Sequence, residues 1–295
     1  MRGALVGPSG VRAGWRLLTF LVVVNVPLGL LQWVVIKVFH VEHVDFAAGP
    51  LILGEAVSLA FAAAGTLVMA RWERRRLERY GVGLVPEGIA LLGEGTLWGA
   101  LSNLAVIALI ALCGGYSVTG LDVHGVALVT TTLLWVAAFL AIALAEEVYF
   151  RGYPLYTLST GIGFWPAAAL LSLGFGALHF FGKPGETWVD GTTVSLIALF
   201  FCLTIRRTGS VWWAVGWHFS WNWMSMGIFG SPNTGNQGRP LPGHLLASSF
   251  HGSTWLTGGP MGAEASLWMF PLLAALFGLF HLRHRVARFP AEDGR

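Results

Sequence analysis

Long apolar runs separated by short polar segments cover nearly the whole chain. Each run is roughly 20 residues long, which is the length that a helix needs to cross a hydrocarbon layer about 30 Å thick. The pattern predicts an all-α, polytopic membrane protein with about eight transmembrane helices. The predicted spans are residues 15–39, 50–70, 94–113, 123–158, 163–181, 190–206, 210–229 and 265–282.

The basic residues lie at the ends of these runs and predict an orientation. With a cytoplasmic N-terminus, 15 of the 18 Lys and Arg fall on the inner side, and Lys37, Lys183 and Arg239 fall outside. Because positively charged loops stay in the cytoplasm, this asymmetry predicts that both termini are inside. The dense group from Arg71 to Arg79 fits a cytoplasmic anchor, with a lipid-headgroup site as the alternative.

The runs also divide the chain into three parts. Residues 1–122 hold the first three helices and the basic cytoplasmic loop, and residues 123–229 hold the next four helices. Residues 230–295 hold an extracytoplasmic loop, rich in Gly, Pro and Ser as far as Glu264, and the last helix. We expect this long loop to be partly packed on the helices.

The composition agrees with lipid as the main solvent of the chain. Hydrophobic residues make up 55% and charged residues 11% of the sequence, whereas soluble domains carry roughly 25% charged residues. The sequence pI of about 9.1 does not indicate nucleic-acid binding, because the basic residues are topology signals. Cys113 and Cys202 lie inside apolar runs, and we interpret them as small buried hydrophobes rather than a disulfide or a metal pair.

Ionisable side chains gather in the fourth span, although each costs about 3 kcal/mol or more at the centre of a bilayer. Its sequence ALAEEVYFRGYPLY contains Glu146, Glu147 and Arg151. Glu147 and Arg151 are four residues apart on a helix, so we predict that they form an ion pair. Glu146 is turned about 100° away and is a candidate general base. The alternative is that all three mark a helix end at the water interface.

Two further spans carry polar groups at a similar depth. The fifth has Phe175 and His179 on one helical face, and the seventh has His218 and Asn222 on one face. At about 1.5 Å per residue from the span ends, Glu146, His179 and His218 all fall near mid-membrane. A single His in a membrane helix is more often structural. Polar groups from three separate spans, however, predict a common cavity.

A cavity of this composition suits peptide hydrolysis. Glu146 and His179 can polarise a water molecule and take its proton, while His218 and Asn222 donate hydrogen bonds to the oxyanion that forms. Zinc is the competing hypothesis, with Glu146, His179 and His218 as ligands. The sequence has no HExxH motif, and Asn is a poor zinc ligand. We therefore favour a site without a cofactor and keep zinc as the alternative.

The order and spacing of three motifs resemble the CPBP family (CAAX protease and bacteriocin-processing), also called the Abi family. They are EEVYFRG at 146–152, FGALH at 175–179 and TGSVWWAVGWHFSWNW at 208–223. The resemblance implies an eight-helix membrane fold with its catalytic core in residues 123–229. It also implies that Glu146 acts with His179 on the water, that His218 and Asn222 stabilise the oxyanion, and that Glu147 and Arg151 support them. The family is often labelled metalloprotease, and its eukaryotic relatives remove the last three residues of prenylated CAAX proteins.

Our hypothesis is an intramembrane endopeptidase that cleaves a membrane-associated peptide or a lipidated, CAAX-type protein, with water entering from the cytoplasmic side. The expected location is the plasma (inner) membrane of a prokaryote, with lipid and the peptide substrate as partners and no nucleic acid. One alternative is a proton-coupled transporter whose Glu and His relay protons, and another is a non-catalytic immunity or scaffold protein of the same fold. Asn25, Glu55 and Asn103 are interpreted as hydrogen-bond partners between helices, with lining of the cavity as the alternative.

Overall fold

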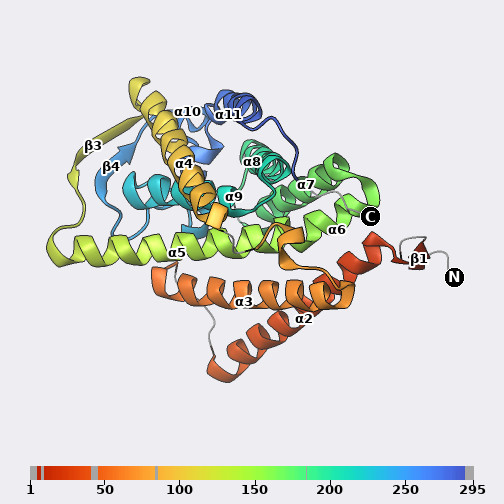
Figure 1. Cartoon of the computed structure of the whole chain (residues 1–295). Helices are drawn as coiled ribbons and strands as arrows, with labels where there is room; N and C mark the ends of the chain where they lie inside the picture. The colour runs from red at the N-terminus through yellow and green to blue at the C-terminus, as the bar shows by residue number, and fades with distance from the viewer. Residues whose placement is uncertain (1–4, 8–9, 41–45, 84–85, 184, 290–295) are drawn as a thin grey trace.

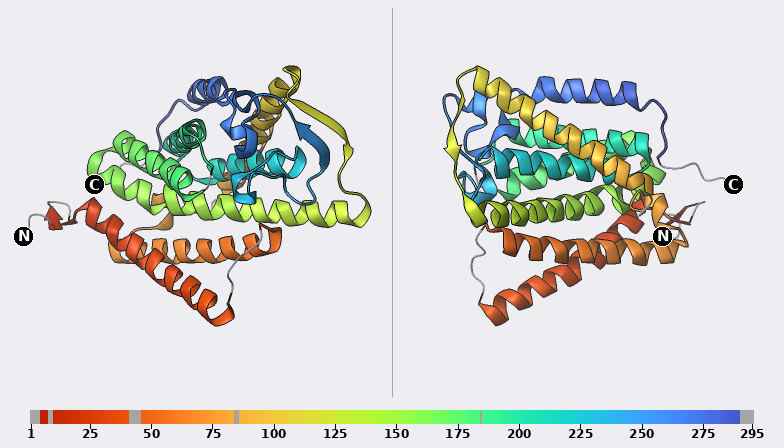
Figure 2. Two further views of the ribbon diagram at one scale, coloured as in Figure 1. Left: turned by 180° about the vertical axis from the view of Figure 1, so that it is seen from behind. Right: turned by 60° about the vertical axis from the view of Figure 1, so that its left-hand side comes forward.

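The computed structural model describes residues 5–7, 10–40, 46–83, 86–183 and 185–289. Long helices dominate it and form one bundle (Figure 1). Figure 2 shows the first long helix at the edge of this bundle, where it splays away from the second. The first three long helices are α2 (Ala13–Phe39), α3 (Ala48–Glu73) and α4 (Pro86–Leu112).

The helices after residue 125 build the centre of the molecule. Large aromatic side chains fill the space between them, and Phe200, Trp213 and Trp217 are almost completely buried there. Such side chains bury the largest apolar area per residue. In chain order these helices are α5 (Gly125–Arg151), α6 (Tyr153–Ile162), α7 (Phe164–Gly182), α8 (Trp188–Thr208), α9 (Trp212–Asn222) with its π-helical continuation η2 (Trp223–Ile228), and α11 (Met269–Arg283).

Every predicted span coincides with a helix, but the helices differ in length. In the described part of the chain, six helical segments are long and apolar enough to cross a membrane, and they match the first six predicted spans. The helices at the last two spans are shorter: α9 has 11 residues, extended by the 6 of η2, and α11 has 15. The protein is an integral membrane protein, and eight crossings stay a prediction.

The fold is all-α, as predicted, with a small antiparallel sheet beside the helices. β3 (Tyr116–Leu121) pairs with β4 (Leu246–Phe250), and Tyr116 lies opposite Phe250. Strands this short lack the long alternation by which a sequence reveals a strand. The remaining short elements are β1 (Val6–Gly7), β2 (Gly10–Val11), η1 (Leu77–Tyr80), η3 (Thr234–Asn236), α10 (Thr254–Thr257), η4 (Gly259–Met261) and η5 (Ala263–Ala265).

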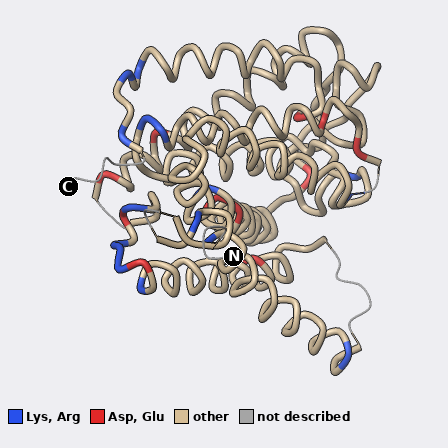
Figure 3. The backbone as a smooth tube through the Cα atoms, turned by 90° about the vertical axis from the view of Figure 1, so that its right-hand side faces the viewer, with Lys and Arg blue, Asp and Glu red and all other residues tan. Residues whose placement is uncertain are grey.

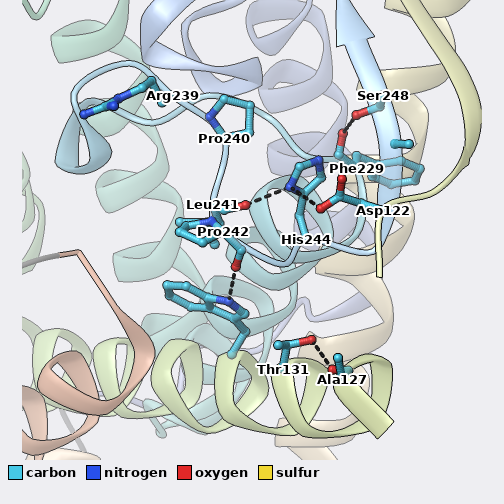
Figure 4. Close-up of polar contacts among 12 residues, drawn as sticks. Asp122, Ala127, Thr131, Phe229, Arg239, Pro240, Leu241, Pro242, His244 and Ser248 are labelled. Carbon is cyan, nitrogen blue, oxygen red and sulfur yellow. Dashed lines mark hydrogen bonds and ion pairs between the residues drawn. The ribbon is translucent and has the colours of Figure 1, made fainter. Parts of the chain in front are cut away.

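The segment between η2 and α11 is packed on the bundle, as predicted. The indole Nε1–H of Trp135 on α5 donates to the carbonyl of Pro242 at 3.1 Å (Figure 4). His244 Nδ1 contacts the carbonyl of Leu241 at 2.7 Å and lies 3.8 Å from the carboxylate of Asp122, beside the end of β3. These contacts hold the loop against the same end of the bundle as the sheet.

The fourth predicted span is not one straight helix, because the helix is interrupted at Gly152. α5 ends at Arg151, and α6 begins at Tyr153 with Pro154 in its first turn. Proline lacks a backbone N–H, so it is tolerated at a helix start and disfavoured inside a helix. The break places Arg151 in the last turn of α5, one turn after Glu147.

Glycine allows α4 and α9 to approach each other at the level of their backbones. A Cβ atom at Gly95 would overlap the carbonyl of Trp213, and one at Gly99 would overlap the carbonyl of Trp217. From the other side, a Cβ atom at Gly216 would overlap the carbonyl of Leu92. Small residues spaced by four are the usual means of close helix contact in membranes. This contact fixes the position of α9.

Gly99→Val is expected to separate α4 from α9 and to destabilise the protein by about 1–3 kcal/mol, the range for overpacking a close contact. The measurement is the midpoint of thermal unfolding in detergent. Gly93→Ala on the same helix is the matched control, because a Cβ atom there meets nothing within 4 Å. Equal stability of the Gly99 and Gly93 variants would contradict this packing.

The basic residues gather at one end of the bundle (Figure 3). This end contains the C-terminal ends of α3 and α8, with Arg71 and Arg206, and the start of α4. The sheet β3–β4 lies at the opposite end (Figure 2). The predicted N-in and C-in orientation rests on this clustering of basic residues at one end.

Candidate active site

One cavity of about 210 Å³ is lined by side chains from five helices. The four predicted catalytic residues all line it: Glu146 from α5, His179 from α7, and His218 and Asn222 from α9. Glu55 from α3 lines the same cavity. Residues far apart in the sequence, from Glu55 to Asn222, thus meet at one place. The apolar wall includes Phe139, Ile142, Phe175, Val194, Ile197, Phe201, Trp217, Trp221 and Met226.

Glu147 and Arg151 form the predicted ion pair next to this cavity, without lining it. Arg151 Nη1 donates to Glu147 Oε1 at 3.0 Å, one helical turn away. The side chains are 0% exposed for Glu147 and 1% for Arg151. The guanidinium also lies over the ring of Phe175, 4.3 Å from its centroid, which is a favourable cation–π distance. The charges therefore compensate each other inside the protein: the pair lies at the end of α5, but it is not exposed to water.

His218 is fixed by the same carboxylate. Its Nδ1 lies 3.0 Å from Glu147 Oε1, and its Nε2 lies 3.8 Å from Glu146 Oε2. Because the Glu147 carboxylate accepts from Arg151 and can only accept, Nδ1 of His218 carries the proton of this hydrogen bond. The ring thus presents Nε2 to the cavity and to Glu146. Glu147 orients the imidazole in the way that a supporting carboxylate orients a catalytic histidine.

His179 presents one nitrogen to the cavity for a similar reason. Its Nδ1 lies 3.0 Å from the carbonyl oxygen of Phe175, one turn earlier on α7. A carbonyl only accepts, so Nδ1–H is the donor, and in the neutral ring Nε2 keeps its lone pair. The ring of Phe175 packs against the imidazole with centroids 4.4 Å apart. His179 is therefore oriented as a hydrogen-bond acceptor for water.

Asn222 stands where the helix changes its geometry. It is the last residue of α9, and the π-helical turn η2 follows directly. Short π-helical turns occur often at functional sites, because they shift the side chains that follow them. His218 and Asn222 lie four residues apart, and both line the cavity. The amide is thus placed beside the imidazole on one face.

The polar rim of the cavity comes from the end of the bundle with the sheet. Lys183 follows α7, and Asn233, Gly235 and Glu264 belong to the segment between η2 and α11. Along α3, Glu55 lies about 10 Å from the first residue and about 27 Å from the last. Burial raises the pKa of the Glu264 carboxyl above its usual range. Because these polar residues and Glu55 lie toward the end of the bundle with the sheet, the structure does not support the expected entry of water from the basic, cytoplasmic end.

Asn25, Glu55 and Asn103 were all interpreted as hydrogen-bond partners between helices, and the structure gives each a different outcome. Asn25 Nδ2 donates to the hydroxyl of Tyr149 at 2.7 Å, which confirms that interpretation for this residue. Asn103 is fully buried, and its amide has no hydrogen-bond partner among the described residues. Glu55 lines the cavity instead of bonding a neighbouring helix. A charged residue inside an apolar run was the available signal for its importance.

The zinc hypothesis requires three ligands that lie close together. Among the described residues, no group of three His, Cys, Asp or Glu side chains is arranged to hold a metal ion. Nδ1 of His218 is bonded to Glu147 and Nδ1 of His179 to the carbonyl of Phe175, which leaves Nε2 of each ring free, as in zinc-binding histidines. Within the suggested ligand set, Glu146 Oε2 and His218 Nε2 lie 3.8 Å apart.

Part of the chain matches a known family. Residues 128–224 match the family model described as type II CAAX prenyl endopeptidase Rce1-like. These residues are similar to that family, and we call them the Rce1-like core. The match agrees with the resemblance to the CPBP family and contains all four predicted catalytic residues, whereas Glu55 lies outside the Rce1-like core. No curated protein and no solved structure matches the chain significantly.

Proposed function

We propose that this protein is an intramembrane endopeptidase that hydrolyses a peptide bond with a water molecule activated by Glu146 and His179. The observation that carries the proposal is the shared cavity, which Glu146, His179, His218 and Asn222 reach from three helices. The orientation of both imidazoles by neighbouring acceptors supports it further. The family match supports proteolysis as the reaction class.

In the proposed reaction, Glu146 takes a proton from water while the water oxygen attacks the peptide carbonyl. A C–O bond forms, and the carbonyl electrons move onto its oxygen. His179 Nε2 accepts a hydrogen bond from the same water and holds it in line with the carbonyl. The C–N bond then breaks, and the amine leaves with a proton.

His218 and Asn222 stabilise the oxyanion in this scheme. Since Nδ1–H of His218 is bonded to Glu147, Nε2 donates a hydrogen bond only when the ring carries both protons. The carboxylate of Glu146, 3.8 Å from Nε2, provides an opposite charge for this imidazolium. The side-chain amide of Asn222 supplies a neutral N–H donor. No step requires a metal ion.

The proposed substrate is a membrane-associated peptide, and a lipidated CAAX-type protein is the specific candidate because of the family description. The apolar wall of the cavity, with Phe201, Trp217 and Trp221, suits an apolar peptide segment. The proposed location is the plasma (inner) membrane of a prokaryote. A transporter or a non-catalytic scaffold would give no hydrolysis in the same assay.

The test is cleavage of a farnesylated peptide ending in a CAAX sequence by purified protein in detergent, with and without a chelator. Cleavage that chelation leaves unchanged is expected. Asn222→Ala is expected to lower kcat about 10²- to 10³-fold, the usual effect of losing one oxyanion donor. Gln32→Ala removes an amide from the exposed face of α2 and is the matched control. Loss of cleavage on metal removal, with recovery on adding zinc, would replace this mechanism by a metal-dependent one.

A further inference from the structure

Glu55 is a carboxyl group of the cavity that the family motifs do not include. It lies on α3, outside residues 128–224, and lines the cavity together with Glu146 and His218. Its side chain is half-buried, in a helix whose remaining residues are almost all apolar as far as Met69. An ionisable residue in such a helix is costly, so its presence requires a physical reason.

The surroundings of Glu55 do not provide a structural reason. Among the described residues, its carboxyl group takes part in no hydrogen bond and no ion pair. The charged or titratable groups that share its cavity include Glu146 and His218, both of the proposed site. Glu147, by contrast, is bonded to both Arg151 and His218. Glu55 is thus a carboxyl group without a structural partner that faces the reacting groups.

Three carboxyl groups line this cavity, those of Glu55, Glu146 and Glu264, and the first two, which lie on the long helices α3 and α5, favour a division of roles. Like charges in a medium of low dielectric repel each other, so one carboxyl keeps its proton while the other is ionised. Glu146 lies 3.8 Å from the imidazole of His218 and is the base of the proposed reaction, so Glu55 is the carboxyl group left to act as an acid. The other charged or titratable groups lining the cavity are His179 on α7, Lys183 after it and Glu264 of η5.

We infer that Glu55 is the general acid that protonates the leaving nitrogen, an inference that rests on the proposed peptidase function. When the C–N bond breaks, its electron pair stays on nitrogen and takes the proton of the Glu55 carboxyl group. Glu55 is then ionised, and Glu146 holds the proton that it took from water. Transfer of that proton from Glu146 to Glu55, across the shared cavity, restores both groups. Water is consumed, and no oxidant, reductant or other reactant is needed.

The test compares two substrates with the same acyl part in a Glu55→Gln variant. One is the farnesylated CAAX peptide, whose amine must be protonated to leave, and the other is the corresponding 4-nitrophenyl ester, whose phenolate leaves without a proton. Glu55→Gln is expected to lower kcat for the peptide about 10²- to 10⁴-fold, with KM nearly unchanged. For the ester, we expect a loss of less than about 10-fold. Glu55→Asp is expected to restore part of the peptide activity.

Ser58→Ala is the matched control, because Ser58 lies one turn further along α3 and bonds only its own helix, at Gly54. Thermal unfolding of each variant checks that the fold is kept. Equal losses on peptide and ester, or wild-type peptide activity in Glu55→Gln, would overturn the role of Glu55 while leaving the peptidase in place. Wild-type protein that cleaves neither substrate would remove the proposed function and this inference together.

Discussion

Glu146→Gln is expected to lower the rate of peptide cleavage about 10³-fold or more, while the protein still inserts and folds. The variant keeps the size of the side chain but removes the group that takes the proton of the attacking water. Glu146 forms no buried ion pair like that of Glu147, and its side chain is 26% exposed in the cavity, so the substitution leaves the packing intact. The measurement is kcat for the farnesylated CAAX peptide, with the unfolding temperature as a check.

Glu87→Gln is the matched control for this substitution. Glu87 lies in the first turn of α4, is exposed and does not line the cavity. The same chemical change there is expected to leave cleavage unchanged. A Glu146→Gln variant that cleaves as fast as Glu87→Gln would rule out Glu146 as the base.

Arg151→Met is expected to destabilise the protein by about 3–5 kcal/mol, the largest effect on stability that we predict. The substitution leaves the carboxylate of Glu147 without a cation in a place where its side chain is 0% exposed. The double variant Glu147→Gln/Arg151→Met removes both charges and is expected to regain much of this loss. The measurement is the free energy of unfolding in detergent.

Arg283→Met is the control for loss of an ion pair at the surface. Arg283 pairs with Glu94, and its side chain is 59% exposed, so we expect a loss of about 1 kcal/mol or less. If Arg151→Met and Arg283→Met cost the same, the buried pair does not stabilise the fold in the way that we describe. The double variant is nevertheless expected to lose activity, because His218 then lacks the carboxylate that orients it.

The positions of the helices could be predicted from the sequence because the lipid-exposed and buried surfaces of a membrane helix are both apolar. Two features of the fold were not predictable: the interruption of the fourth span and the small sheet. The break at Gly152 lies inside an apolar run and depends on local backbone geometry near Pro154. The sheet β3–β4 joins segments more than 120 residues apart in five- and six-residue strands, which no local pattern reveals.

The candidate site, like the fold, was predictable from the sequence only in part. Helical spacing predicted the Glu147–Arg151 pair, and counting depth predicted that Glu146 and His179 approach His218. The bond from Glu147 to His218 was not predictable, because it depends on how α5 and α9 are rotated toward each other. Glu55 was underestimated for the same reason, since a polar residue between helices and one facing a cavity look alike in sequence.

The glycine contact between α4 and α9 has a consequence for how a peptide gains access. Where the backbones of α4 and α9 are in contact, no side chain lies between them that could change its rotamer. The position of α9, and with it that of His218, is therefore rigid. α3 carries few buried residues toward its start, and α2 beside it splays outward at that end. We therefore expect the cavity to widen for a substrate at the wall that carries Glu55, the proposed proton donor, so that binding of the peptide also positions this group.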